Sequence, residues 1–369
     1  MKDWQNCKKI LCVRADNMGD LIMTTPALRA LKETFDCHIT ILTSKAGSLI
    51  AGCIPDIDKV IVSNLPWVKC DNSLVDTQLQ TLVREIKKEA FDAAIIFTVY
   101  SQSALPAALF CFMAGIPRRL AYARENPYAL LTDWLPDKEP YSYIQHQVQR
   151  DVNLVNHIEA FTNTEGLSIY YSEEVRASAL KKLQGLGINL ANSWIILHPG
   201  VSEERRSYPF MYWIKIGQLI ARQSDLPILI TGSSAERELT DALSEQIGPQ
   251  SHSVAGLFTI EEFVTLIAST KAVISVNTST IHIAAATRTP AVVLYALTNP
   301  QHTPWKSPHI LLTYSVKEAI RSKNEVVRYV SEHHLNQDLS YPSPEEVADA
   351  LKVILQGDDN KIFSRNTGV

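Results

Sequence analysis

Residues 10–28 read ILCVRADNMGDLIMTTPAL, and this stretch decides the fold class of the chain. The apolar run ILCV (10–13) is typical of a buried strand, and the apolar spacing after residue 26 is that of a helix. In nucleotide-binding proteins the turn between such a strand and helix usually carries several glycines that cradle a phosphate. Here it carries one glycine, Gly19, followed at once by Asp20. The chain therefore begins with an α/β unit whose first turn presents a carboxylate.

The same alternation of short Val/Ile/Leu-rich runs and helical segments continues along the chain and predicts parallel sheets covered on both faces. Strands are expected at 10–15, 38–44, 59–63, 93–99, 194–200, 227–232, 272–276 and 291–296. Helices are expected at 26–35, 46–51, 74–89, 211–223, 235–247, 260–268 and 280–287. Both halves of the chain are thus expected to be doubly wound, Rossmann-like α/β domains.

A length of 369 residues favours two domains. A charged helix and Gly/Asn-rich turns predict a linker at 171–192, between an N-terminal domain (1–170) and a C-terminal domain (193–340). A last helix is expected within 341–358, because Ser343-Pro344-Glu345-Glu346 has the form of a capping box, and a tail (359–369) follows it. Since open α/β sheets bind ligands at the carboxyl ends of their strands, polar residues just after strands are the candidate site residues.

Composition excludes several classes of protein. A net charge of −4 argues against nucleic acid as the main partner. The six cysteines, all in the first third of the chain, lack zinc-site spacing and are expected to be reduced core thiols. No signal-peptide core is present, and the apolar run 104–116 is too short to span a bilayer, so it predicts a buried helix. A cytoplasmic protein is expected, compatible with contact at the inner face of the membrane.

Asn17 and Asp20 stand in the first turn after a strand. Asp20 can cap a helix or favour its positive N-terminal end, or it can serve as a general base at a strand's end. The helix that follows has either Thr25 as its N-cap and Pro26 in its first position, or a start at Asp20 and a kink at Pro26. The sequence leaves these alternatives open.

The segment HPGVSEERRSYP (198–209) follows a predicted strand of the second half. Its glycine, Gly200, allows close approach of the backbone to a ligand, and its guanidinium groups suit a phosphate. An exposed loop explains the same arginines equally well. The candidate residues here are Gly200, Ser202, Arg205 and Arg206.

Two further segments of the second half carry polar candidates. Glu236 has the S-x-x-E spacing of a capping box, and alternatively can accept hydrogen bonds from ribose hydroxyls. In SVNTSTIHIAAATRTP (275–290) a helix start offers free N–H groups, which form an anion site. The candidates there are Asn277, Thr278, Ser279 and His282, the last with a core or capping role as its alternative.

Two remaining signals are weaker. Asp56-Ile57-Asp58 has the D-x-D form that some glycosyltransferases use for a metal, but its place before a strand and beside Pro55 predicts a turn. The segment PRRLAYARENPY (117–128) is a local basic patch, suited to an acidic sugar or a lipid phosphate or else a solvated turn. Its arginines, Arg118, Arg119 and Arg124, are acceptor candidates together with Asn17.

Taken in order, the post-strand segments resemble glycosyltransferase family 9, the heptosyltransferases that build the inner core of lipopolysaccharide. The matching pieces are NMGDLIMTTPALRALK, HPGVSEERRSYP, TGSSAERE and NTSTIHIAAATRTPAVVLYALTNP. The resemblance implies a GT-B fold: two Rossmann-like domains facing a central cleft, the donor held by the C-terminal one, and a final helix crossing back. It also implies metal-independent, inverting transfer of a heptose or related sugar from an ADP-activated donor to a glycan or glycolipid acceptor.

The resemblance assigns roles position by position. Asp20 falls on the family's proposed catalytic base, Glu236 on an acid that contacts the donor ribose, and Arg205 or Arg206 near a diphosphate-binding lysine. Asn277, Thr278, Ser279 and His282 fall on a D-T-G-x-x-H motif around the diphosphate and sugar. Asn277 departs from the motif's Asp and Ser279 from its Gly. Neither a metal nor another cofactor is expected.

Two alternatives come from other functional classes. The departures at Asn277 and Ser279 suggest a sugar-nucleotide-binding protein that has lost catalysis. A sugar-nucleotide epimerase on the same architecture would release an epimer without any acceptor.

Overall fold

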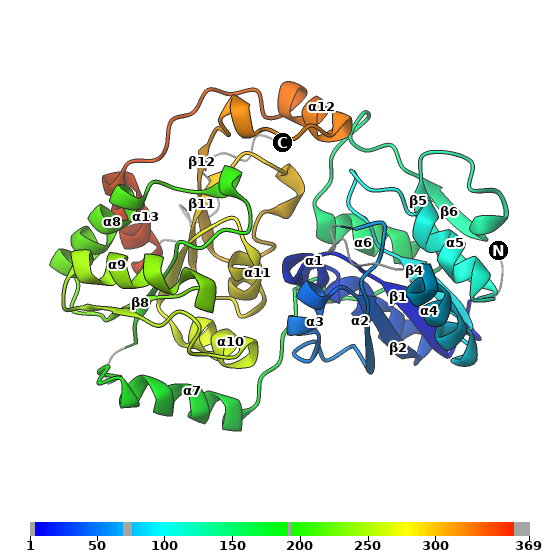
Figure 1. The fold of residues 1–369 in the computed structure, drawn as a ribbon, viewed down its shortest axis with the longest axis horizontal. Coiled ribbons are helices and arrows are strands. Elements are labelled where there is room, and N and C mark those ends of the chain that lie inside the picture. Colours follow the sequence, from blue (N-terminus) through cyan, green and yellow to red (C-terminus); the bar gives the residue numbers. More distant parts are fainter. Residues whose placement is uncertain (1–3, 69–75, 191–192, 358–369) are drawn as a thin grey trace. The chain divides into compact units, whose positions relative to one another are not determined.

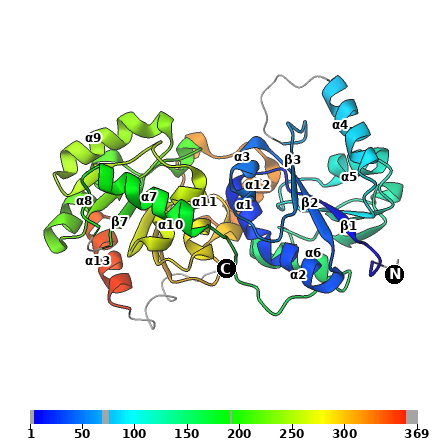
Figure 2. The same ribbon diagram turned by 90° about the horizontal axis from the view of Figure 1, so that it is seen from below.

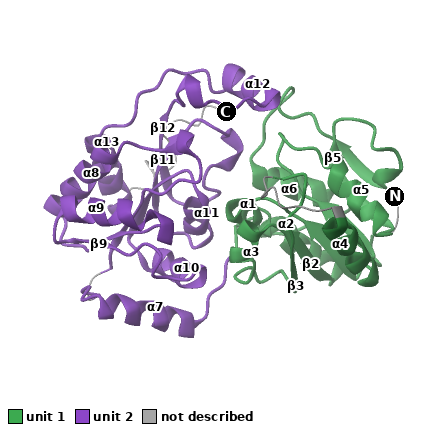
Figure 3. Ribbon diagram, in the orientation of Figure 1, with its two compact units in different colours: residues 1–168 green, residues 169–369 purple. Residues whose placement is uncertain are grey.

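The computed structural model describes residues 4–68, 76–190 and 193–357 (Figure 1). The chain divides into two compact units, residues 1–168 and 169–369 (Figure 3). Each unit contains a six-stranded sheet in which all the paired strands are parallel, so the predicted α/β class is confirmed. Cys70 and the predicted tail (359–369) lie outside the described residues.

In unit 1 the strand order is β3-β2-β1-β4-β5-β6. The chain winds outward from β1 in one direction through β2 and β3, and in the other through β4, β5 and β6. Ile10 of β1 accordingly lies opposite both Ile39 of β2 and Ala93 of β4, which places the switch point between β1 and β4. The strands are β1 (Lys9–Val13), β2 (His38–Thr43), β3 (Lys59–Val62), β4 (Ala93–Ile96), β5 (Arg118–Ala123) and β6 (Asp133–Pro136).

The helices of unit 1 cover this sheet (Figure 2). They are α1 (Met18–Met23), α2 (Thr25–Phe35), α3 (Lys45–Ala51), α4 (Asp76–Lys88), α5 (Leu105–Met113) and α6 (Gln147–Asn156). Neither predicted start of the helix after β1 is correct, because two helices are present: Asn17 is the N-cap of α1 and Thr24 that of α2. The hydroxyl of Thr24 bonds to the backbone oxygen of Asp20 (2.9 Å) at the break.

α5 occupies the apolar run that predicts a buried helix. Phe110 and Cys111 on one face are buried, but Leu109, Phe112 and Met113 are 46%, 48% and 54% exposed. The prediction is therefore right for one face only. None of the helices in the described part of the chain has the length and apolar character needed to cross a membrane. The cysteines other than Cys70 are buried, as predicted for core residues.

In unit 2 the strand order is β12-β11-β10-β7-β8-β9, so its switch point lies between β7 and β10. The strands are β7 (Ile195–His198), β8 (Ile228–Ile230), β9 (Ser251–Ser253), β10 (Ala272–Val276), β11 (Ala291–Ala296) and β12 (His309–Tyr314). The helices are α7 (Glu173–Gly185), α8 (Phe210–Gln223), α9 (Arg237–Ile247), α10 (Ile260–Ser269), α11 (Ser279–Ala286), α12 (Glu325–His333) and α13 (Pro344–Leu355).

Two helices at the borders of unit 2 pack within it. α7 lies in the segment predicted as a linker, and Ser178 and Lys182 on it donate hydrogen bonds to the Glu262 carboxylate of α10 at 2.8 and 2.6 Å. α13 begins at the predicted capping box of Ser343. Its apolar residues join the core of unit 2 because this face complements α8 and the sheet. They are Val347, Ala350, Leu351 and Ile354. The expectation that this last helix crosses back stays a prediction.

Candidate active site

Asp20 lies in the first turn of α1, beyond the carboxyl end of β1. Its Oδ2 accepts a hydrogen bond from the backbone N–H of Asn17 (3.2 Å), and its Oδ1 accepts one from Nη2 of Arg14 (3.2 Å). The predicted capping contact is thus present. It is compatible with a base at this position, because each carboxylate oxygen has two lone pairs and the two donors fix the group in one orientation. Asp20 is 8% exposed.

Arg14 is fully buried and stands between the carboxylates of the first turn. Its Nε lies 3.5 Å from Oδ2 of Asp16, in addition to the contact with Asp20. Burial lowers the pKa of this guanidinium, but Asp151, Asp16 and Asp20 outweigh burial and raise it overall. Arg14 is therefore a fixed cation around which these carboxylates are arranged. Arg14 is not among the predicted site residues, since a single Arg after a strand carries no distinctive signal.

Asp151 on α6 forms a hydrogen bond at the end of α1. Its Oδ2 accepts a hydrogen bond from the Thr24 hydroxyl (2.8 Å) and its Oδ1 accepts one from Nε2 of Gln147 (2.8 Å). Burial raises the pKa of Asp151 to about 6, against the opposing effect of Arg14. The sequence gives no indication of this role, because charged residues in an amphipathic helix normally face solvent.

The arginines of the predicted basic patch lie at opposite ends of β5. Arg118 and Arg119 lie at the amino end of this strand, whereas Arg124 follows its carboxyl end. Arg119 is 7% exposed, and its guanidinium donates to the backbone carbonyls of Leu130 (2.7 Å), Ala129 (2.8 Å) and Ile116. Arg118 and Arg119 thus stand at the sheet edge opposite to Asp20, and their role in acceptor binding stays a prediction.

Arg124 remains at the carboxyl edge of the sheet. Its Nη2 lies 3.2 Å from the backbone oxygen of Glu139 and 3.6 Å from Oδ2 of Asp137. Asp137 and Glu139 in turn bind the buried Arg150 of α6, with Nη1 distances of 2.9 and 2.5 Å. Arg124 is therefore an exposed cation attached to a buried ionic cluster at the edge that carries Asp20.

In unit 2, Gly200 and Glu236 are brought together just beyond β7 and β8. A Cβ at position 200 would lie 2.3 Å from Oε1 of Glu236, so any other residue here would require this carboxylate to shift. Glu236 Oε2 accepts hydrogen bonds from the backbone N–H (2.6 Å) and the hydroxyl (2.8 Å) of Ser233, as the capping interpretation predicts. Nearby, burial lowers the pKa of His198 to about 4, although Glu236 acts in the opposite direction.

Arg206 reaches from the loop after β7 to the loop after β10. Its Nη1 donates a hydrogen bond to the backbone oxygen of Asn277 (3.1 Å). Within the described residues, Nε of Arg206 and Oγ1 of Thr278 are buried and have no hydrogen-bond partner. Buried polar atoms in this state are rare and are expected to meet a ligand or ordered water. Arg205 pairs with Glu203, whose Oε1 also lies 3.7 Å from Nη2 of Arg206, and Ser202 is exposed.

Asn277 has a structural function that its place in the motif does not predict. Its Nδ2 donates to the backbone oxygen of Ala296 (3.1 Å) and to Thr298 Oγ1 (3.2 Å), and its Oδ1 accepts from the backbone N–H of Ala296 (3.2 Å). The side chain thus clamps the ends of β10 and β11 together. An aspartate could not supply the donor half of this clamp.

The first turn of α11 follows this clamp. Thr278 is its N-cap and Ser279 its first residue, so the free N–H groups of the helix start lie beside Arg206. His282 is 5% exposed, and its ring centroid lies 6.3 Å from that of His302. This arrangement of a helix N-terminus and an arginine suits an anion.

Of the metal candidates, Asp58 is engaged in local structure. Its Oδ2 accepts hydrogen bonds from Nζ of Lys32 (2.5 Å) and the backbone N–H of Ile39 (2.7 Å). Across residues 4–68, 76–190 and 193–357, no three His, Cys, Asp or Glu side chains are grouped so that they could hold a metal ion.

Comparison with known proteins places the chain in a family. The model of glycosyltransferase family 9 (heptosyltransferase) matches residues 79–339. The chain belongs to glycosyltransferase family 9. Lipooligosaccharide heptosyltransferase 2 of Haemophilus influenzae is 25% identical over 307 residues, covering 80% of this chain and 85% of that protein. Lipopolysaccharide heptosyltransferase 2 of Escherichia coli is 21% identical, covering 94% and 98%.

Solved structures of this family share the fold of this chain. A family 9 glycosyltransferase from Veillonella parvula superposes with a TM-score of 0.79 at 19% identity, covering 97% of this chain and 99% of that one. The ADP-heptose lipopolysaccharide heptosyltransferase II of E. coli gives 0.70 at 18% identity, covering 95% and 99%. The predicted GT-B fold is therefore confirmed, and the chain is a glycosyltransferase.

Proposed function

We propose that this family 9 glycosyltransferase transfers a heptose, or a related sugar, from an ADP-linked donor to a glycan acceptor of the lipopolysaccharide-core type, with inversion and without a metal. The donor class is supported by the family and by an E. coli heptosyltransferase, of TM-score 0.62 and 16% identity, that was solved with ADP. The acceptor class is supported by the relatives' names, which are those of lipopolysaccharide and lipooligosaccharide heptosyltransferases.

The observation that carries the proposal is the fixed carboxylate of Asp20. Arg14 and the Asn17 N–H orient it at the carboxyl edge of the unit 1 sheet. In the proposed reaction Asp20 removes the proton of an acceptor hydroxyl, and the hydroxyl oxygen attacks the anomeric carbon of the donor from the face opposite the diphosphate. The bond from the anomeric carbon to the diphosphate oxygen breaks, and ADP leaves.

The leaving diphosphate gains negative charge as this bond breaks. The N-terminus of α11 and the guanidinium of Arg206 stabilise it, with Thr278 Oγ1 as a further hydrogen-bond partner. Glu236 accepts hydrogen bonds from the ribose hydroxyls. These fixed dipoles and the cation supply the stabilisation that a metal ion gives in other transferases, so activity should persist in excess EDTA.

Asp20→Asn tests the proposal in a transfer assay with ADP-heptose and a heptose-deficient lipopolysaccharide acceptor. We expect kcat to fall by a factor of about 100 or more, the usual contribution of a general base, while ADP still raises the melting temperature. The anomeric configuration of the wild-type product, read by NMR, tests inversion. Near-normal kcat in the variant would show that Asp20 is not the base.

A further inference from the structure

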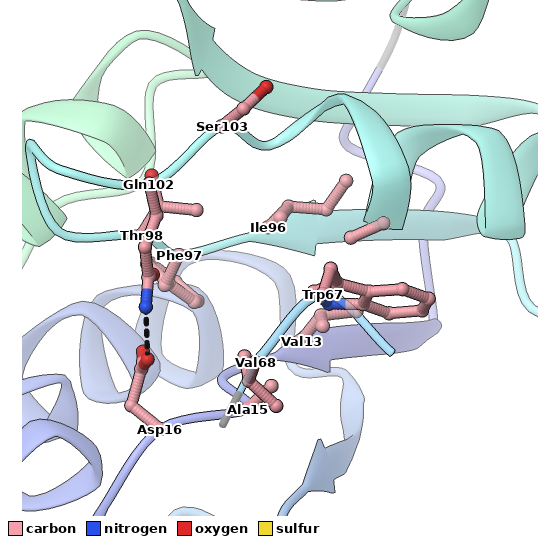
Figure 4. Close-up of a pocket in the computed structure, with 11 residues that line it drawn as sticks. Val13, Ala15, Asp16, Trp67, Val68, Ile96, Phe97, Thr98, Gln102 and Ser103 are labelled. Carbon is pink, nitrogen blue, oxygen red and sulfur yellow. Dashed lines mark hydrogen bonds between the residues drawn. The ribbon is translucent and has the colours of Figure 1, made fainter. Parts of the chain in front are cut away.

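Side chains connect the loops at the carboxyl edge of each sheet. In unit 1, Nε2 of Gln102 donates a hydrogen bond to Oδ1 of Asp16 at 2.5 Å, and Figure 4 shows the two side chains pointing toward each other. The space left beside this pair, at the ends of β1 and β4, measures about 20 Å³, which is room for about one water molecule. In unit 2 a tyrosine, Tyr314, makes the connection, and it reaches a residue of the donor site.

Tyr314 is the last residue of β12 and is 1% exposed. Its hydroxyl donates a hydrogen bond to the backbone oxygen of Arg206 at 2.7 Å, and the backbone oxygen of Ser207 lies 3.3 Å away. The backbone oxygen of Tyr314 accepts a hydrogen bond from the N–H of Leu297 (3.0 Å), which follows β11. Tyr314 thus links the loop that carries Arg206 to the carboxyl end of β11.

These contacts close a ring that holds Arg206 from two sides. The side chain of Asn277 clamps the backbone of Ala296 at the end of β11, and the backbone oxygen of Asn277 accepts a hydrogen bond from Nη1 of Arg206 (3.1 Å). Arg206 is therefore held at its backbone oxygen by Tyr314 and at Nη1 by Asn277. The two contacts fix the orientation of Nε, which is buried, has no hydrogen-bond partner within the described residues and is available to a ligand.

The ring of Tyr314 is itself fixed by an aromatic cluster. Its centroid lies 4.9 Å from that of Tyr341 and 6.2 Å from that of Tyr208. The hydroxyl of Tyr208 donates to the backbone oxygen of Pro342 (2.6 Å), in the segment that leads into α13. Burial raises the pKa of both Tyr208 and Tyr314, so both hydroxyls remain protonated donors. The two tyrosines thus share one environment but bind different segments of the chain.

We propose that Tyr314 is a positioning residue for the donor diphosphate: its hydroxyl fixes the backbone of Arg206, and so the guanidinium that binds the leaving group. This inference rests on the proposed function, because that function assigns Arg206 to the diphosphate. Without the hydroxyl, the loop would leave the binding position for part of the time. The apparent Kd for ADP rises in inverse proportion to the fraction of molecules in which Arg206 is in place.

Isothermal titration calorimetry of ADP against the full chain tests the proposal with Tyr314→Phe. The ring and its packing remain, and one hydrogen bond is lost, so the Kd for ADP should rise roughly fivefold. In the transfer assay the KM for ADP-heptose should rise, and the acceptor KM should not change.

Tyr208→Phe is the matched control, because it removes a buried hydroxyl of the same aromatic cluster that bonds Pro342 rather than Arg206. It should lower the melting temperature about as much as Tyr314→Phe does, but it should leave the Kd for ADP unchanged. An equal rise of the Kd in both variants would overturn the proposal, since it would show a general loosening of the cluster. An unchanged Kd in Tyr314→Phe would overturn it as well.

A double-mutant cycle with Arg206→Ala gives a readout that a merely structural role would not move. Arg206→Ala should raise the Kd for ADP roughly tenfold or more, the effect of a lost hydrogen bond to a charged group. Tyr314→Phe should then add nothing, because the side chain that it positions is absent, and additive effects would contradict positioning.

The cycle also distinguishes failure of this inference from failure of the proposed function. A weakened Arg206→Ala with a normal Tyr314→Phe would refute the positioning role and leave the proposed function in place. A wild-type Kd in Arg206→Ala, or no binding of ADP by the wild type, would refute the donor side of the proposed function and the positioning role with it. Because ADP binding is measured without transfer, the result is independent of the Asp20→Asn assay.

Discussion

The carboxylate of Glu236 lies directly over Gly200, so close that a Cβ at position 200 would stand 2.3 Å from Oε1 and 2.6 Å from the carboxyl carbon. Gly200→Ala must therefore displace the Glu236 carboxylate from its hydrogen bond with the backbone N–H of Ser233. We expect a loss of about 1–3 kcal/mol in the free energy of unfolding, as for other overpacked sites, and weaker binding of ADP-heptose. Urea unfolding and isothermal titration calorimetry measure the two effects.

The clash can be separated from any intrinsic effect of alanine by a double-mutant cycle. In a Glu236→Ala background, Gly200→Ala should cost little stability, because the carboxylate is gone. Two residues in contact give a coupling energy of about 0.5–3 kcal/mol in such a cycle. Additive effects would show that the close approach of Glu236 to Gly200 is not what requires glycine.

Asn277→Asp restores the residue found in the family motif, yet we expect it to reduce stability. The new carboxylate would face the backbone oxygen of Ala296, which would lose Nδ2 as a donor but keep the N–H of Thr298 (2.7 Å). The loss of one hydrogen bond and the placing of a charged oxygen against a buried carbonyl oxygen should together cost about 1–3 kcal/mol. Urea unfolding should show the loss, and the transfer assay should show no gain in kcat. A more active, equally stable variant would contradict the clamp.

The central strands could be predicted because they are buried on both faces and appear as runs of Val, Ile and Leu, as in β1, β4, β10 and β11. The edge strands β6 (DWLP) and β9 (SHS) are short and contain polar residues or proline, so periodicity does not detect them. The break between α1 and α2 was missed for another reason. It depends on contacts of Thr24, including one with Asp151, a residue 127 positions away.

Site residues that directly follow a predicted strand, such as Asp20, Gly200 and Asn277, could be proposed from the sequence. Asp151 could not, because tertiary packing alone brings α6 to the first turn. The sequence also does not show that a strand separates the members of the arginine patch. Arg119 and Arg124 are five positions apart in the sequence but lie at opposite ends of β5.

Asp151 should make stability depend on pH. Its pKa is raised to about 6 in the folded chain, whereas an aspartate in the unfolded chain titrates near about 3.9. The folded state thus binds the proton more tightly, and the free energy of unfolding falls as the pH rises from about 4 to about 6. The loss from this group amounts to about 3 kcal/mol.

Asp151→Asn isolates this contribution, because the amide does not titrate and its oxygen can still accept the hydrogen bond that the Thr24 hydroxyl donates. The difference in unfolding free energy, wild type minus variant, should decrease between pH 4 and pH 6 and be constant above about pH 7. Chemical denaturation at a series of pH values measures it. A difference that does not change with pH would show that Asp151 is ionised in the folded chain throughout this range.

Arg119→Lys and Arg124→Lys should separate a structural arginine from an acceptor-binding one. Arg119 donates to three backbone carbonyls, and lysine cannot reproduce this planar fork, so we expect a loss of about 2 kcal/mol in stability with an unchanged acceptor KM. Arg124 is exposed and bonds a backbone oxygen at 3.2 Å, so its replacement should change stability by less than about 1 kcal/mol. With an anionic lipopolysaccharide acceptor, however, Arg124→Lys should raise KM, because bidentate contact with a phosphate or carboxylate is lost. Urea unfolding and acceptor titrations of both variants test this expectation. A raised acceptor KM in Arg119→Lys, with an unchanged acceptor KM in Arg124→Lys, would indicate that the acceptor binds at the amino end of β5.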